Sequence, residues 1–569
     1  MNCKILFCSI IFFVTQKVLA QNPLFIPDTL SGTNFYLDVH ADTHEFYPGY
    51  QTDTYGISAS YLAPVLFLKK GDVVSLNVAN NLADATTMHW HGLHIAPEND
   101  GGPHTPIAPG TVWNPQFEVM NAAGTFWYHP HLHEHTNEQV SKGAAGMIIV
   151  RDNIEATLPL PRHYGSDDIP IILQTKPFNT IKQIPLNSHM DSVALVNGTR
   201  KAVWQAPAQV VRFRLLNAAT DRTFLLGFDA NMPFYQIATD AGLMQNPIML
   251  TRLRLAPGER AEILVDLTNK QGQTIWLKSI ASELPTGIIG AASVGNGMMQ
   301  LEGYAGNPIN GSDFNFLKIE VGAPTANAIT QIPTSLVSLS HPSAADAQTN
   351  RTITFEPQGG MMMGVNGPFQ FNGQAFDMDV INYTIPLGNT EVWTLNNQTM
   401  IAHPFHIHDI AFWLLERNGQ TVPASEQGWK DVVLVMPMST VKFITTFTDF
   451  ANPNVPYMYH CHVLLHEDEG MMGQFVVVNP EGVQDTNLAA NLHLSPNPAT
   501  EQLNISVTLP KQTETTLTVF NTLSQLIFST SFNNTNSINY LLNTNTYAKG
   551  IYYLRITQNG QSTTAKFVK

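Results

Sequence analysis

Side chains that can bind a metal ion are concentrated in the segment YHCHVLLHEDEGMM, where Cys461 lies between His460 and His462. Cys461 is also the one cysteine expected in the mature chain, because Cys3 and Cys8 lie in an N-terminal apolar segment. A lone thiolate cannot form an intramolecular disulfide bond. Flanked by imidazoles and followed by a thioether, it can bind copper.

The same segment, read as a strand, can contact two metal sites. Successive side chains of a strand point to opposite faces, so His460 and His462 point one way and Cys461 the other. His466 and Met471 follow far enough along the chain to fold back toward Cys461. Two histidines, a cysteine and a distant methionine form the ligand set of a blue-copper electron-transfer site.

Three more segments contain histidines two residues apart: HWHGLH, FWYHPHLHEH and HPFHIHD. Each such pair puts two imidazoles on one face of an extended segment. A single pair is readily explained as coincidence, whereas four pairs accompanied by a cysteine and a methionine indicate metal binding. Half of the chain's 20 histidines fall in the four motifs: His89, His91, His129, His131, His403, His406, His408, His460, His462 and His466.

At these residues the chain resembles the multicopper oxidases, the family of laccases, bilirubin oxidases and the periplasmic cuprous oxidases of bacteria. The resemblance spans residues 30 to 480 and implies four copper ions, one of type 1, one of type 2 and two of type 3. The implied type 1 ligands are His403, Cys461 and His466, with Met471 axial, and the implied type 2 ligands are His89 and His406. The implied type 3 ligands are His91, His129, His131, His408, His460 and His462.

Two carboxylates match family positions that move protons. Asp100, in PENDGGP, stands where the cuprous-oxidase branch has a proton-relay carboxylate, and Glu467 directly follows a copper ligand in a similar position. The resemblance implies that both shuttle protons or orient ligand histidines. The alternative is that Asp100 caps the turn at Gly101 and Gly102 and that Glu467 is a surface residue.

The elements that must position these residues are predicted to be strands. Runs such as VVSLNVANNL, VVRFRLLNA and KFITTFTDF are rich in β-branched residues and partly alternating. The 569 residues include 38 Gly and 36 Pro, with 44% hydrophobic and 13% charged residues, which suits several turn-rich β domains. A net charge of −15 without a basic tract argues against nucleic acid or an anionic membrane as partner.

The sequence thus predicts an all-β protein, and the resemblance makes its domains cupredoxin-like Greek-key β-sandwiches. Three are expected, at residues 22–155, 160–320 and 351–480. The metal motifs lie only before residue 135 and after residue 400, so the trinuclear copper cluster is expected between the first and third domains. Copper should then couple these two domains energetically.

The two ends of the chain indicate export. Residues 1–20 have a positive start, the apolar run ILFCSIIFFV and a small-residue cleavage site, as a signal peptide does. The apolar run is too short to span a bilayer, and no later segment reads as a membrane span. Residues 490–569, with LNISVTL and YAKGIYYLRI, resemble the C-terminal sorting domain of the type IX secretion system. The alternative is a small accessory β-sandwich.

Several other residues admit two interpretations. His94, His104, His133 and His135 either extend a route by which copper reaches the site or are supporting and surface histidines. Met361, Met362 and Met363 either bind Cu(I) or pack as adaptable apolar side chains. The same holds for Met298 and Met299. The long methionine-rich insert of the cuprous oxidases is absent.

The resemblance implies an exported oxidase of laccase-like breadth. Phenols, aromatic amines or a reduced metal ion give single electrons to the type 1 copper, and dioxygen is reduced to water at the trinuclear cluster. Cys461 would conduct electrons through the backbone to His460 and His462. One alternative is a dedicated metallo-oxidase for Cu(I) or Fe(II) in copper tolerance, which acidic residues around His403 and His466 would favour. Another is a copper-binding protein without turnover.

Overall fold

The computed structural model describes residues 21–569 except 296–299, 361–363, 480–491, 523–524 and 559–560. The chain forms two compact units, Met1–Val478 and Asn479–Lys569. Strands dominate both, so the predicted all-β fold is confirmed. The α-helices in the described residues are α1 (Thr136–Ser141) and α2 (Leu464–Asp468). Single 3-10 turns are η1 (Pro97–Asn99), η2 (Glu155–Thr157), η3 (Asp229–Asn231), η4 (Ala281–Glu283), η5 (Ala344–Asp346), η6 (Gln358–Gly360) and η7 (Ala424–Glu426).

The first sandwich of unit 1 packs two sheets around an apolar core. One sheet has the order β2 (Thr29–Ser31), β5 (Val65–Lys69), β10 (Gly146–Arg151), β9 (Gly124–Tyr128). The other has the order β4 (Tyr50–Ile57), β3 (Asn34–Tyr47), β6 (Val73–Asn80), β7 (Val112–Trp113), with β8 (Gln116–Glu118) also on β6. Period-two alternation explains the strands: in β3, Phe35 and Leu37 are buried while Tyr36 is exposed.

The second sandwich contains a six-stranded and a seven-stranded sheet. The six strands are, in order, β1 (Asn22–Pro23), β14 (Ala202–Ala206), β22 (Phe314–Val321), β21 (Thr274–Ser279), β16 (Phe224–Phe228) and β19 (Leu253–Leu255). The seven are β13 (Thr199–Arg200), β12 (Val193–Val196), β11 (Asp168–Lys176), β15 (Val210–Asn217), β20 (Arg260–Asp266), β17 (Phe234–Thr239) and β18 (Gly242–Leu250). Because β1 pairs with β14, the described chain contributes a strand here before it enters the first sandwich.

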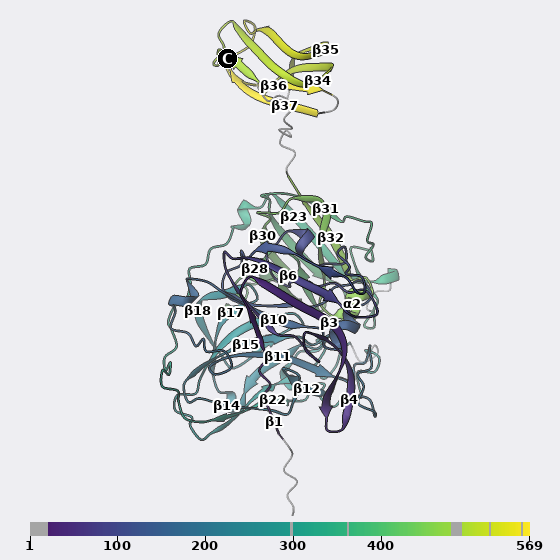
Figure 1. Ribbon diagram of the computed structural model, residues 1–569, viewed down its shortest axis with the longest axis vertical. Helices are drawn as coiled ribbons and strands as arrows, with labels where there is room; N and C mark the ends of the chain where they lie inside the picture. The colour runs from purple at the N-terminus through teal and green to yellow at the C-terminus, as the bar shows by residue number, and fades with distance from the viewer. Residues whose placement is uncertain (1–20, 296–299, 361–363, 480–491, 523–524, 559–560) are drawn as a thin grey trace, which may run out of the picture. The chain divides into compact units, whose positions relative to one another are not determined.

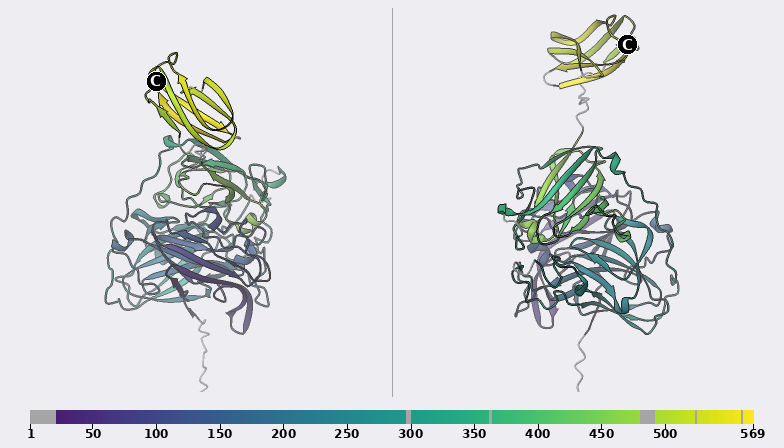
Figure 2. Two further views of the ribbon diagram at one scale, coloured as in Figure 1. Left: turned by 45° about the horizontal axis from the view of Figure 1, so that its top comes forward. Right: turned by 180° about the vertical axis from the view of Figure 1, so that it is seen from behind.

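The third sandwich holds most of the candidate ligands and has two five-stranded sheets. One has the order β24 (Phe369–Phe371), β23 (Thr349–Pro357), β26 (Thr390–Asn397), β30 (Ser439–Thr446), β28 (Trp413–Arg417). The other has the order β25 (Tyr383–Pro386), β32 (Met472–Val478), β31 (Asn452–Cys461), β27 (His403–Ile407), β29 (Val432–Val435). Within unit 1, its green strands lie toward one end and the teal strands of the second sandwich toward the other (Figures 1 and 2).

Unit 2 is built from five strands: β33 (His493–Ser495), β34 (Gln502–Asn521), β35 (Leu526–Asn543), β36 (Ile551–Gln558) and β37 (Gln561–Val568). Register shifts divide the long β34 into two parts. Ile505 from one part and Leu517 from the other lie in the same apolar core, so the sheet folds over on itself.

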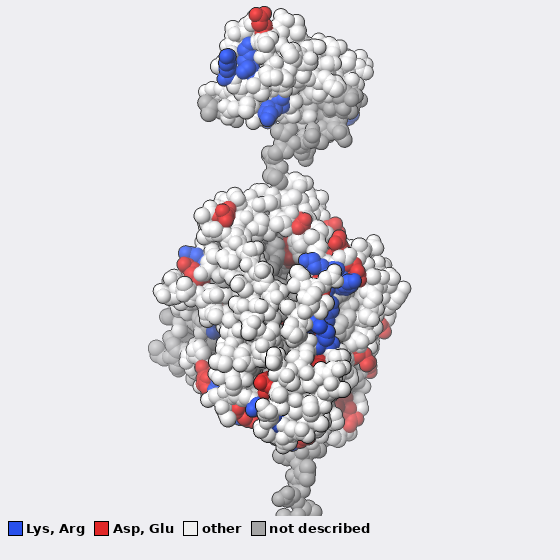
Figure 3. Space-filling view, turned by 90° about the vertical axis from the view of Figure 1, so that its left-hand side faces the viewer, with Lys and Arg blue, Asp and Glu red and all other residues white. Residues whose placement is uncertain are grey.

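On the face of unit 1 in Figure 3, most of the basic side chains gather in one strip, and acidic side chains lie beside it. In the described part of the chain no helix is long and apolar enough to cross a membrane.

Candidate metal centres

The pairing of β27 with β31 places ligands on two faces of one sheet. His406 lies opposite His460, and Phe405 lies opposite Cys461, so each pair shares a face. Phe405 and Cys461 belong to the hydrophobic core of the third sandwich. His406 and His460 point away from that core, and His460 meets His131 of the first sandwich. The alternation predicted around Cys461 is therefore present.

A buried cysteine–histidine cluster lies inside the third sandwich. The Sγ of Cys461 is 3.5 Å from the Nδ1 of His403 and 3.6 Å from the Nδ1 of His466. Strand β27 supplies His403, and helix α2 supplies His466. The hydroxyl oxygen of Thr399 lies 2.9 Å from the Nε2 of His403. When Nε2–H donates to that oxygen, the Nδ1 lone pair faces Cys461.

The electrostatics of this cluster favour a bound cation. Burial raises the pKa of the Cys461 thiol, lowers the pKa of His403 well below its usual value and lowers the pKa of His466 to about 3. The imidazoles are therefore neutral, and the thiol loses its proton when a cation compensates the charge. Met471 is buried in the same core, and its carbonyl accepts the N–H of Cys461. This sulfur and nitrogen donor set fits copper.

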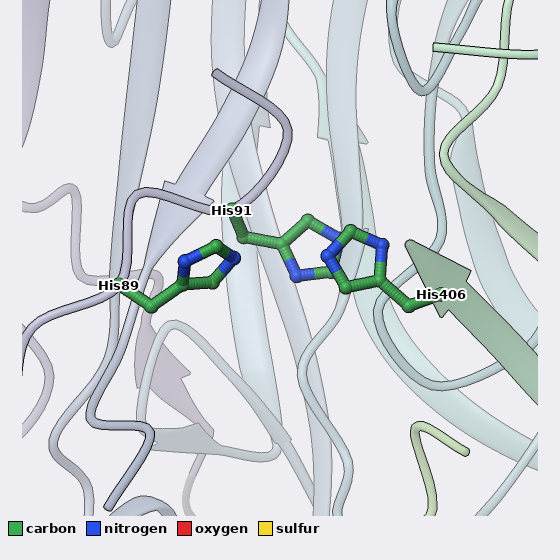
Figure 4. Close-up of side chains that lie close together, drawn as sticks. All are labelled: His89, His91 and His406. Atoms are coloured by element: carbon green, nitrogen blue, oxygen red, sulfur yellow. The ribbon is translucent and has the colours of Figure 1, made fainter. Parts of the chain in front are cut away.

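The other eight motif histidines form three groups, in each of which one ligand atom per residue lies within 4.8 Å of the others. The groups are His91, His129 and His462; His131, His408 and His460; and His89, His91 and His406. Each combines histidines of the first and third sandwiches, as the motif order predicts. Figure 4 shows the last group: His89 and His91 extend from one loop, and His406 from β27. The rings of His91 and His406 stack with centroids 3.7 Å apart.

The nitrogen geometry of these groups also fits bound cations. The Nε2 of His460 lies 3.1 Å from the Nε2 of His131 and 3.4 Å from that of His408. Among the described residues, the buried Nε2 atoms of His89, His129 and His406 have no hydrogen-bond partner. Burial lowers the pKa of His131 and of His462 to about 3. Protons are thus disfavoured where lone pairs converge, which leaves copper as a suitable partner for these nitrogens.

Both predicted relay carboxylates are buried beside the histidine groups. The Oδ2 of Asp100 accepts a hydrogen bond from the Nδ1 of His408 at 2.7 Å, and its backbone carbonyl accepts from the Nδ1 of His89 at 3.0 Å. The Oε2 of Glu467 lies 3.0 Å from the Nδ1 of His460, and its Oε1 lies 3.5 Å from the Nδ1 of His131. Glu467 is 1% exposed, so its interpretation as a surface residue is wrong.

Asp431 is a functional candidate that the sequence did not reveal. Its Oδ1 lies 3.2 Å from the Nε2 of His91, and its backbone carbonyl accepts from the Nδ1 of His406 at 2.8 Å. It lies in GWKDVV, directly before strand β29, at no fixed spacing from the histidine motifs. Thr399, four residues before His403, is a second contact to a candidate ligand that the sequence analysis did not identify.

The four additional histidines lie outside the ligand groups of the described residues. His94 is held by Asp409 at 2.8 Å and by Asp449 at 3.1 Å, and the Nε2 of His104 lies 2.7 Å from Gln474. His133 is half-buried and His135 is exposed. Met298, Met299, Met361, Met362 and Met363 lie outside the described residues, as does the predicted signal peptide.

A cavity of about 50 Å³ lies beside His466, with His189, Asp191 and Asp221 in its lining. The Nδ1 of His189 is 3.0 Å from the Oδ2 of Asp221. Burial alone would raise the pKa of Asp221, but the hydrogen bond from His189 holds it below its usual value, so Asp221 is a carboxylate at neutral pH. Two acidic residues therefore line the cavity that reaches His466, and one of them, Asp191, is paired with Arg222.

Comparisons with known proteins agree with this geometry. Residues 38–155 and 341–481 match multicopper oxidase domains, and residues 493–569 match the secretion system C-terminal sorting domain. The multicopper oxidase mco of Staphylococcus haemolyticus is 32% identical over 455 residues, covering 78% of this chain and 89% of that protein. The cell division protein FtsP of Escherichia coli is 29% identical over 473 residues, covering 81% of this chain and 93% of that protein.

Two solved structures superpose on most of the chain. The laccase-like multicopper oxidase CueO from Ochrobactrum sp., which has oxidase activity towards lignin model compounds and lignosulfonate, superposes with a TM-score of 0.70 at 33% identity. The superposition covers 80% of this chain and 100% of the Ochrobactrum protein. A metallo-oxidase from Campylobacter jejuni superposes with a TM-score of 0.65 at 26% identity, covering 82% of this chain and 99% of that one.

Proposed function

The chain belongs to the multicopper oxidase family, and we propose that it takes electrons singly from a reducing substrate and uses four of them to reduce dioxygen to water. Bound copper would supply the one-electron chemistry, which none of the side chains in these clusters provides alone. The cluster around Cys461 supports a type 1 site that His403, Cys461 and His466 would hold, with the thioether of Met471 as a further ligand.

The eight remaining histidines would hold three further copper ions. We assign His89 and His406 to a type 2 site. The type 3 pair would be held by His91, His129 and His462 on one side and by His131, His408 and His460 on the other. The two type 3 sets are two of the groups in which the nitrogen atoms converge, and the type 2 pair is the third group without His91.

The chain itself provides a short route between the two sites. Cys461 faces the core of the third sandwich. Its covalent neighbours His460 and His462 belong to the two histidine groups that we assign to the type 3 pair. Electrons delivered to the thiolate therefore need to cross only the backbone of adjacent residues. Asp100 and Glu467 lie within reach of ring nitrogens on the far side of the ligands, where they can supply protons or fix ring orientation.

The observation that supports the proposal most strongly is that strand β31 contributes Cys461 to the cysteine cluster and His460 to the histidine groups. Oxygen consumption tests the proposal. Copper-loaded protein should consume dioxygen with a phenol or with Cu(I), each measured with and without added Cu(II). Strong phenol turnover without added copper supports laccase-like breadth. Absence of uptake at full copper occupancy rejects oxidase function and leaves a copper-binding role.

A second candidate, a metallo-oxidase for Cu(I) or Fe(II), is favoured by the cavity beside His466. At about 50 Å³ the cavity is smaller than the roughly 150 Å³ that holds benzene in an engineered protein core. Asp221 lines it as a carboxylate, and carboxylates attract cations, whereas Asp191 is already paired with the guanidinium group of Arg222. An aromatic substrate would have to approach His466 from the mouth of the cavity, whereas a metal ion could enter it.

Replacing Asp221 with asparagine separates the two candidates. The substitution keeps the shape and removes one negative charge, so the KM for Cu(I) should rise by roughly fivefold, while the KM for a phenol stays unchanged. Steady-state oxygen uptake with both substrates measures this. Ser188→Ala, in the lining of the same cavity, is the uncharged control. Equal effects on both substrates would exclude Asp221 as a cation-attracting group.

Copper should also stabilise unit 1, because ligands from two sandwiches must come together to bind it. A ligand at a thousandfold its Kd adds about 4 kcal/mol to the free energy of unfolding. Calorimetry of copper-loaded and chelated protein should therefore show a higher Tm for the loaded form. Identical melting curves at proven occupancy would mean that copper does not couple the sandwiches.

The C-terminal domain indicates export or display at the cell surface, since residues 493–569 match a sorting domain. We propose that secretion machinery recognises this domain after residues 1–20 direct the chain to the periplasm. The domain has a core of its own and supplies none of the candidate ligands among the described residues. It would therefore act as an address and take no part in oxidation.

A further inference from the structure

The second sandwich supplies no candidate ligand among the described residues, yet it reaches the histidine groups directly. The turn before β20 packs on His462: a Cβ added to Gly258 would lie 2.8 Å from the Cδ2 and 2.9 Å from the Nε2 of that ring. Gly258 has a φ of +82°, which favours glycine as well. Two residues later, the fully buried Arg260 points from β20 toward the third sandwich.

Arg260 binds Asp431 with both arms of its guanidinium group. Its Nη1 and Nη2 donate to Oδ1 and Oδ2 of Asp431, each at 2.5 Å. The remaining hydrogen bonds go to three carbonyls: Nε donates to Thr125 of the first sandwich, and Nη1 and Nη2 donate to Gly258 and Asp240 of the second. One side chain thus ties together all three sandwiches beside the histidine groups.

Asp431, held by Arg260, in turn contacts two of the proposed ligands, His91 and His406. Its Oδ1, 3.2 Å from the Nε2 of His91, accepts that N–H and leaves the Nδ1 lone pair of His91 facing His462, 3.3 Å away. Its backbone carbonyl accepts from the Nδ1 of His406, which leaves the Nε2 of that ring free.

The backbone next to His91 is shaped around the same ion pair. Gly92 has a φ of +86°, and a Cβ added there would collide with the Oδ2 of Asp431 and lie 2.7 Å from the Nη2 of Arg260. Only glycine leaves room for the pair at this position.

We propose that Arg260 is a positioning residue for the trinuclear copper site, acting through Asp431 on His91 and His406. This inference rests on the proposed function, because it takes these histidines as copper ligands. A lysine cannot replace the arginine, since a single ammonium cannot donate to two carboxylate oxygens and three carbonyls in one fixed plane. The second sandwich then has a defined task at a site whose ligands all come from the other two.

The test compares Arg260→Lys with Arg212→Lys in the full-length, copper-loaded protein. Arg212 is equally buried in the same sandwich, is held by Glu262 and Glu155, and contacts no candidate ligand in the described part of the chain. Against a copper chelator, Arg260→Lys should retain trinuclear copper 10- to 100-fold more weakly, with an altered type 2 electron paramagnetic resonance signal. Its type 1 visible absorption, which reports an intact third sandwich, should persist. Arg212→Lys should match the wild type in both signals.

If Arg260→Lys yields no visible absorption, Asp431→Asn provides the second variant, because it keeps the side-chain shape and the backbone carbonyl. It should show the same selective loss of trinuclear copper. Since Arg260 acts through Asp431, the double variant should lose no more than the more affected single variant.

The inference would be overturned if Arg260→Lys and Asp431→Asn retained trinuclear copper as tightly as the wild type. It would also be overturned if the losses of copper affinity in the two single variants added up in the double variant. Failure of the proposed function is a different result: wild-type protein would then bind fewer than four copper ions or consume no dioxygen.

Discussion

Cys461→Ser should abolish the intense visible absorption of the copper-loaded protein and lower oxidase turnover on the order of a thousandfold or more. The thiolate is the soft ligand that produces a blue-copper site, and a serine hydroxyl is a far weaker donor to copper. Cys461 is also the covalent link between the two sets of ligands, with His460 and His462 on either side. Optical absorption and oxygen uptake on the purified variant measure both effects.

The trinuclear site should survive this substitution, because the eight histidine ligands proposed for it are unchanged. Three copper ions and the type 2 resonance signal should therefore remain in Cys461→Ser. Met471→Leu is the matched control: a thioether would be the weakest of the four proposed ligands, so its loss should leave visible absorption in place. Turnover above about a tenth of the wild-type rate in Cys461→Ser would show that electrons reach dioxygen by another route.

The sequence was most informative where chemistry depends on neighbours in the chain. Alternation within one strand was enough to predict that His460 and His462 face away from Cys461, because side-chain direction in a strand is local. The four motifs likewise identified every histidine that the structure gathers into the three groups and the cysteine cluster. The predicted all-β architecture follows from the same local signals.

Features that depend on how sandwiches meet could not be predicted this way. Asp431 reaches His91 across an interface between residues 340 positions apart, and no spacing in the chain encodes that contact. The ion pair of Arg260 with Asp431 joins the second and third sandwiches, although motif order alone suggests that the second has no part in the site. The cavity beside His466 similarly combines loops of separate sandwiches, which leaves substrate choice outside the reach of the motifs.

Glu467 shows the limit most clearly, and its removal should have the second largest effect. Adjacent to His466 in helix α2, it also admits interpretation as a surface residue from sequence, but the structure buries it between His460 and His131. Glu467→Gln keeps the size of the side chain and removes its ability to exchange a proton. Turnover should therefore fall about 100-fold, within the range attributed to a positioned acid or base.

The two half-reactions distinguish a proton-transfer role for Glu467 from a structural one. Without dioxygen, substrate should bleach the visible absorption of Glu467→Gln as fast as that of the wild type, because the proposed type 1 ligands are unchanged. When dioxygen is added, recovery of the absorption should be slow and should slow further in heavy water. Glu469→Gln makes the same chemical change at an exposed position two residues along and should behave as the wild type does. A different outcome would be that Glu467→Gln contains less copper while its absorption recovers at the normal rate. The carboxylate would then serve to hold His460 and His131, because a group needed only for proton transfer would leave the metal content unaffected.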